Sequence, residues 1–142
     1  MSLQIQAQAT LELLRLRGAY IPREERYRAF QRRYYDDPAA FLRECIEWDG
    51  PTSYQVDCAR ALAAHRRVCI RAPHGVGKTA LAALLVIWFA LTRDGQDWKI
   101  IVTAGAWRQV IHYLWPEIRK WAARLRWERI GRVPFREGIE LL

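Results

Sequence analysis

The sequence predicts an α/β fold, in which a doubly wound parallel sheet follows a helical N-terminal segment. Two observations lead to this prediction. The first is that residues 1–50 have the apolar spacing of amphipathic helices. The second is that residues 51–142 alternate short apolar runs with longer helical patterns. The second part gives, in order, a strand, a glycine-rich loop, a helix, a strand and a helix. This order is typical of parallel strands joined by right-handed crossovers.

The helical segment is predicted from an aromatic stripe. Tyr27, Phe30 and Tyr34 recur at spacings of three and four on an otherwise charged stretch, which places them on one face of a helix. Pro38 suits the first turn of a second helix. The turn residues at 49–53 then mark the boundary between the two parts of the chain.

The predicted sheet rests on two apolar runs. Val68 to Ile70 are consecutive and apolar, as expected for a parallel strand that is buried on both faces, and residues 99–103 give a second strand. A helix over residues 79–93 joins them. Helical patterns at 54–65 and 107–126 come before and after.

The composition is that of a folded intracellular protein. The chain has 142 residues, of which 51% are hydrophobic, and a formal net charge of +8. A basic balance of this size allows a polyanionic partner without establishing one. The three cysteines have no metal-ligand spacing, and the longest apolar run, residues 80–91, is shorter than the roughly 20 residues of a membrane span. We therefore expect a soluble protein with reduced cysteines.

The glycine-rich loop predicts phosphate binding. Residues 72–79 fit the pattern GxxxxGK[ST] with alanine in the first position. In this pattern the glycines let backbone N–H groups point at phosphate oxygens, Lys78 reaches the β- and γ-phosphates, and the Thr79 hydroxyl binds Mg²⁺. The expected cofactors are ATP and Mg²⁺. The alternative is a tight turn with a solvated lysine. The predicted contact residues of the loop are Ala72, Pro73, His74, Gly75, Val76, Gly77, Lys78 and Thr79.

The chain resembles the N-terminal part of the large subunit of tailed-bacteriophage terminases. The resemblance covers about residues 30–135 and is carried by the helical leader and by residues 35–55, 66–79 and 100–121. Terminase large subunits are ATPases that pump viral DNA into a procapsid. The resemblance implies an incomplete P-loop NTPase core in the cytoplasm of a bacterial host. The implied partners are double-stranded DNA, the small terminase subunit and the procapsid portal, with no membrane.

The resemblance also implies a role for two residues ahead of the loop. Tyr54 and Gln55 match a pair that contacts adenine in terminases, where the ring stacks on the base and the amide bonds to its edge. The alternative is a tyrosine that caps a helix and a glutamine in solvent.

Basic residues in the last third of the chain leave two interpretations open. Arg108 and Gln109 follow the second predicted strand and could contact DNA phosphates, or could be ordinary surface residues. The apolar residues favour core packing, because they recur at helical spacing: Leu114, Trp115, Ile118, Trp121 and Leu125. The remaining basic residues could still form a weak DNA-binding face: Arg119, Lys120, Arg124, Arg126, Arg129 and Arg132.

The acidic residues needed for hydrolysis are not evident. Terminases place an acidic pair after an apolar strand to hold Mg²⁺ and to orient water, whereas residues 138–142 (GIELL) lack the preceding apolar run. We therefore expect residues 51–142 to be the first part of an ATPase domain, without its Walker B half and nuclease domain. No catalytic residue is assigned, and ATP should bind without turnover. The alternatives are a non-catalytic nucleotide- or DNA-binding remnant and part of a helicase-type ATPase.

Overall fold

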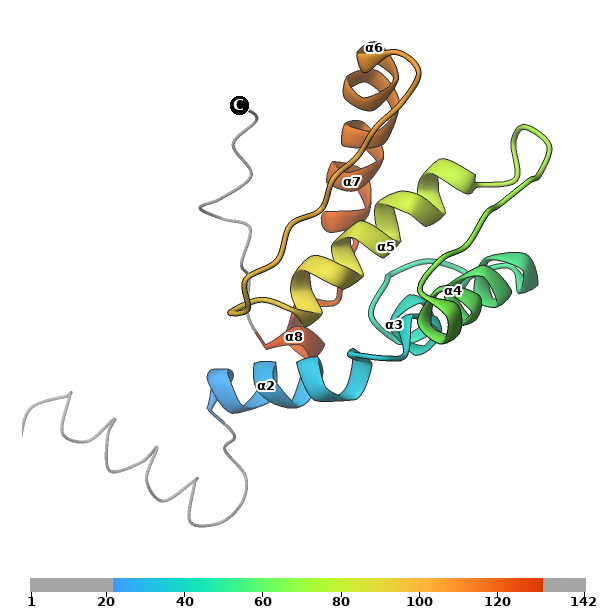
Figure 1. The fold of residues 1–142 in the computed structure, drawn as a ribbon. Coiled ribbons are helices and arrows are strands. Elements are labelled where there is room, and N and C mark those ends of the chain that lie inside the picture. Colours follow the sequence, from blue (N-terminus) through green and yellow to red (C-terminus); the bar gives the residue numbers. More distant parts are fainter. Residues whose placement is uncertain (1–21, 132–142) are drawn as a thin grey trace, which may run out of the picture.

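The computed structural model describes residues 22–131 (Figure 1). Residues 1–21, part of the expected helical segment, and residues 132–142, which include Arg132 and the run 138–142, lie outside the described residues. The elements in chain order are α2 (Arg23–Tyr34), α3 (Pro38–Glu44), α4 (Ser53–His65), α5 (Lys78–Thr92), α6 (Trp107–Gln109), the π-helix η1 (Val110–Leu114), α7 (Trp115–Ala122) and α8 (Trp127–Ile130).

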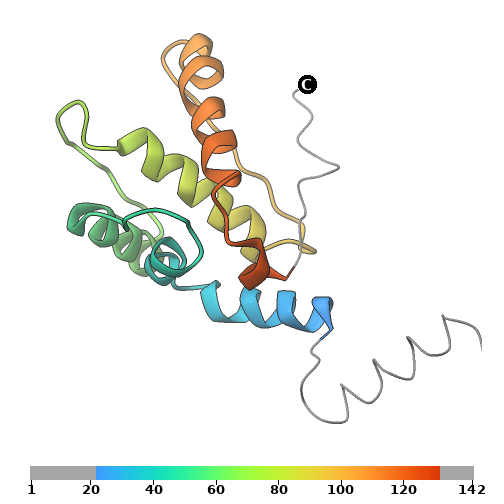
Figure 2. The ribbon, with the colours of Figure 1, turned by 180° about the vertical axis from the view of Figure 1, so that it is seen from behind.

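The predicted sheet is wrong, and with it the α/β class and the incomplete P-loop NTPase core. The described residues are helical and contain no sheet, and the β-type pairing found among them is an isolated bridge between Ile46 and Leu125. Both predicted strands are extended connections. Figures 1 and 2 show these connections on opposite sides of α5, so they cannot pair with each other.

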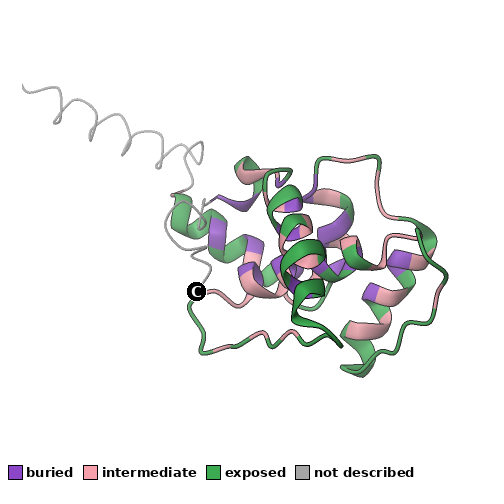
Figure 3. Ribbon diagram, turned by 90° about the horizontal axis from the view of Figure 1, so that it is seen from above, coloured by how far each residue is buried: buried purple, intermediate pink, exposed green. Residues whose placement is uncertain are grey.

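Burial gives the physical reason for this error. A strand inside a parallel sheet is covered on both faces, but Val68 and Ile70 are 37% and 36% exposed and Ile101 is 85% exposed. Figure 3 shows the same contrast, with buried residues concentrated on the helices while the long connections are exposed or intermediate. A short apolar run between turns is compatible with an extended connection as well as with a strand. It becomes a strand only if a neighbouring strand supplies the backbone hydrogen bonds, and the run itself does not show whether one is present.

Helix α5 is the centre of the core. It contacts α7, α2, α3 and η1, and its sequence is apolar on almost every side, as expected for a helix surrounded by others. Full burial of each large aliphatic side chain contributes about 1.5–3 kcal/mol relative to exposure. The α5 residues buried in the core are Leu81, Ala83, Leu84, Ile87, Trp88 and Leu91.

The aromatic stripe predicted on α2 is confirmed and packs on α5. Tyr27, Phe30 and Tyr34 are all buried. Two hydrogen bonds fix the contact: the indole N–H of Trp88 donates to the backbone oxygen of Tyr34 (2.6 Å), and the Tyr27 hydroxyl donates to the backbone oxygen of Leu91 (3.1 Å). Burial of these polar groups is therefore compensated.

The helical pattern predicted at 107–126 is confirmed over residues 107–122, with a local irregularity before Pro116. Proline has no N–H to donate to the carbonyl four residues earlier, and the turn just before it widens into η1, where the N–H of Trp115 bonds to the oxygen of Val110. Beyond it, Ile118, Trp121 and Leu125 are buried, and Leu114 and Trp115 pack against the core. Trp115 and Trp121 therefore serve packing, whereas Trp107 and Tyr113 are 65% and 66% exposed.

No helix among the described residues is long and apolar enough to cross a membrane.

Candidate nucleotide-binding site

The glycine-rich loop leads directly into the central helix. Gly75 and Gly77 have φ angles of 82° and 81°, a left-handed conformation that glycine adopts without steric cost. Gly77 is the N-cap of α5, and no side chain caps that end of the helix. The N–H groups of the first turn therefore face the loop without a side-chain acceptor, at the positive end of a helix of 15 residues.

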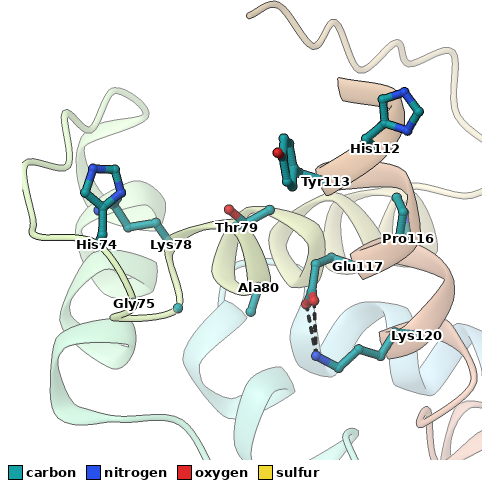
Figure 4. Close-up of a pocket in the computed structure, with 11 residues that line it drawn as sticks. His74, Gly75, Lys78, Thr79, Ala80, His112, Tyr113, Pro116, Glu117 and Lys120 are labelled. Atoms are coloured by element: carbon teal, nitrogen blue, oxygen red, sulfur yellow. Dashed lines mark hydrogen bonds and ion pairs between the residues drawn. The ribbon is translucent and has the colours of Figure 1, made fainter. Parts of the chain in front are cut away.

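The loop opens on a cavity of about 530 Å³ (Figure 4). This volume lies within the usual range for a small-molecule site, about 300–1,000 Å³. One wall is the loop and the start of α5, and the other wall comes from η1 and α7. The residues of the first wall are His74, Gly75, Gly77, Lys78, Thr79 and Ala80; those of the second are His112, Tyr113, Pro116, Glu117 and Lys120.

Lys78 is held across its own loop. Its ammonium donates hydrogen bonds to the backbone oxygens of Ala72 (2.6 Å) and Pro73 (2.5 Å). These two residues do not line the cavity and act through their carbonyl groups. Because a phosphate oxygen is a stronger, charged acceptor than a carbonyl, a bound anion can take over the same ammonium.

Thr79 is exposed at the start of α5 and lines the cavity. Its hydroxyl fits the predicted Mg²⁺ contact only together with phosphate oxygens and water, because no group of three or more His, Cys, Asp or Glu side chains able to hold a metal occurs within residues 22–131. Val76, the remaining loop residue, is half-buried and lies outside the cavity lining.

Gln55 lies behind the loop, outside the lining of the cavity. Its side chain is 5% exposed, and its Oε1 accepts a hydrogen bond from the backbone N–H of Thr52 (3.0 Å), which completes a capping box at the start of α4. Its Nε2 is so close to Gly77 that a Cβ added there would lie 2.9 Å away. The Gln55 side chain is therefore engaged at the start of α4 and lies close against Gly77.

Tyr54 also lies outside the cavity lining. Its ring packs partly against the hydrophobic core, and burial of the hydroxyl raises its pKa, with a further contribution from the neighbouring Cys58 thiol. Neither residue of the predicted adenine-contacting pair therefore faces the cavity in this arrangement.

The second wall of the cavity contains residues that the sequence did not single out for nucleotide binding. Glu117 accepts hydrogen bonds from the ammonium of Lys120 (3.1 and 3.3 Å) and from the indole N–H of Trp121 (2.8 Å). These residues are spaced three and four apart, which places them on one side of α7. The spacing of these residues could be read from the sequence, but the sequence did not show that α7 would lie opposite the loop.

The other basic residues face solvent. Arg108 and Gln109 are exposed on α6 and do not line the cavity, and Arg119, Arg124 and Arg129 are exposed while Arg126 is half-buried. Arg124 lies over the ring of Trp121, 5.5 Å from its centroid. At this pair the Trp121 ring packs inward, while the Arg124 guanidinium remains outside.

Comparisons of the chain with models of protein families, with curated proteins and with solved structures give no match.

Proposed function

We propose that the cavity at residues 72–79 binds ATP together with Mg²⁺. The observation that carries the proposal is the conformation of the loop: two glycines of positive φ precede Lys78 and Thr79, which open a long helix beside a cavity of suitable size. The backbone N–H groups of the first turn and the Thr79 hydroxyl lie at the cavity, and the Lys78 ammonium is bonded to the carbonyls of Ala72 and Pro73 in the adjoining loop. These are the kinds of donor that bind a nucleotide polyphosphate.

We further propose that the chain is the ATP-binding portion of a DNA-packaging motor of the terminase large-subunit type, acting in the bacterial cytoplasm. The resemblance of residues 35–55, 66–79 and 100–121 to that family supports this role. The proposed partners are double-stranded DNA, the small terminase subunit and the portal. The exposed arginines of the described residues support the DNA partner, since contacts to phosphates need no base recognition.

Binding without turnover is the expected behaviour of this chain. Within the described residues, Glu117 is the carboxylate that lines the cavity, and it is already paired with Lys120 and Trp121. The sequence offers no acidic pair after an apolar strand that could hold Mg²⁺ and orient water for attack on a phosphate. A non-catalytic module that binds nucleotide or DNA is the second candidate function.

Nucleotide binding is tested with two of the three lysines of the chain, Lys78 and Lys99. Lys78→Ala should abolish the rise in melting temperature that ATP and Mg²⁺ cause, because this ammonium neutralises phosphate charge inside the loop. Lys99→Ala is the matched control, since Lys99 is exposed and lies outside the cavity. Circular dichroism of both variants checks the fold. An ATP-induced shift that survives equally in both variants would remove Lys78 from the site.

A further inference from the structure

We propose that Lys120 is a second phosphate-binding cation of this site, and that a bound nucleotide draws it away from Glu117. The inference rests on the proposed function, because it assigns a role to the opposite wall of the same cavity. Lys78 binds the phosphates from the loop side of the cavity, and Lys120 binds them from the opposite wall.

Packing fixes the position of Lys120. Helix α7 lies against α5, with Ile118 and Trp121 buried at 6% exposure each. With this face turned inward, Glu117 extends from α7 toward the start of α5, and Lys120 reaches the same carboxylate (Figure 4). Both side chains therefore line the cavity that Thr79 lines from the other side.

The contact between Lys120 and Glu117 is weak enough to be exchanged. The two side chains are 48% and 26% exposed, and ion pairs of this kind contribute little because water screens them. Exchange leaves Glu117 with a partner, since the indole N–H of Trp121 donates to the same carboxylate. Release of Lys120 therefore does not leave an unpaired acid.

The charge of the lining favours this exchange. Lys78 lies on one wall of the cavity, and Lys120 lies beside Glu117 on the other, so the lining carries two lysines and one glutamate. A polyphosphate inside would be attracted by both lysines and repelled by Glu117. A polyphosphate carries more negative charge than the single Glu117 carboxylate. Movement of Lys120 from Glu117 to a phosphate oxygen therefore places its ammonium next to the larger charge, in a charge-assisted hydrogen bond.

The test compares the affinities of ATP, ADP and AMP by calorimetry. Lys120→Ala should weaken ATP binding about tenfold, the size expected for loss of one charge-assisted hydrogen bond, and should weaken AMP binding little. Lys99→Ala should leave all three affinities unchanged, and Lys120→Arg should retain most of the preference for ATP. Glu117→Gln, which removes the competing charge, should strengthen ATP binding.

Three other outcomes are informative. Failure of the wild-type chain to bind ATP would overturn the proposed function, and this inference with it. Binding that Lys78→Ala abolishes but Lys120→Ala leaves equal to that of Lys99→Ala would overturn the inference alone. Weaker ATP binding by Glu117→Gln would also overturn it, because the carboxylate would then be helping the ligand instead of competing with it.

Discussion

Gly77 is the point at which a side chain of α4, that of Gln55, approaches the glycine-rich loop closely. Its φ of 81° already disfavours most side chains, and a Cβ added to Gly77 would lie only 2.9 Å from the Nε2 atom of Gln55. Gly75 has nearly the same φ, 82°, but no atom lies within 4 Å of an added Cβ. Substitution of Gly75 therefore tests backbone strain alone, whereas substitution of Gly77 tests the strain together with a steric contact.

Gly77→Ala should destabilise the protein by about 1–3 kcal/mol, the range for a residue forced into a sparsely populated conformation. Gly75→Ala, the matched control, should cost less, because it carries the strain without the contact to Gln55. Urea unfolding of both variants measures the difference. Equal destabilisation by the two substitutions would show that Gln55 moves aside freely and does not hold the loop.

At the scale of elements, the extended connection between α5 and α6 distinguishes the helical fold from the predicted sheet. Ile101 lies in this connection and is 85% exposed, whereas Leu84 on α5 is fully buried. In a parallel sheet both would be core residues. Substitution by alanine should therefore change the free energy of unfolding by different amounts at the two positions in the helical fold, and by similar amounts in a sheet.

Ile101→Ala should change the free energy of unfolding by no more than about 0.5 kcal/mol, as usual for a surface position. Leu84→Ala should cost about 2–5 kcal/mol, because it leaves a cavity in the core. Denaturant unfolding with far-ultraviolet circular dichroism measures both. A loss for Ile101→Ala that approaches the loss for Leu84→Ala would mean that residues 99–103 are buried after all.

At the scale of the whole molecule, the charge of +8 bears on the proposed DNA partner. A motor that moves along any sequence needs contacts to phosphates, and such contacts release counterions. Affinity for duplexes of unrelated sequence should therefore be similar and should fall steeply with salt. Tight binding to one sequence, insensitive to salt, would contradict the proposed motor role.

Single arginine variants locate this binding. Arg108→Ala should lower the slope of log affinity against log salt by about 0.9, the value for one lost phosphate contact. Arg33→Ala is the control, because its guanidinium is already paired with Glu44 at 2.9 Å. An unchanged slope for Arg108→Ala would place the DNA elsewhere on the molecule.

The sequence by itself determined the helices and the loop. The stripe of Tyr27, Phe30 and Tyr34 and the spacing of Ile118 and Trp121 predicted helix faces correctly, because a helix forms its hydrogen bonds within its own segment. The glycines that precede Lys78 have the positive φ values that the loop motif requires. These features depend on residues close together in the chain.

Only the tertiary structure showed that the predicted sheet does not form and that α7 provides the second wall of the site. A strand needs a neighbour that is distant in sequence, and the residues around Val68 and Ile101 have none within the described chain, so their apolar runs were misread. Lys120 lies about 40 residues beyond the loop, and only the packing of α7 on α5 brings it to the cavity. Local patterns cannot specify such contacts, because they depend on which apolar faces meet.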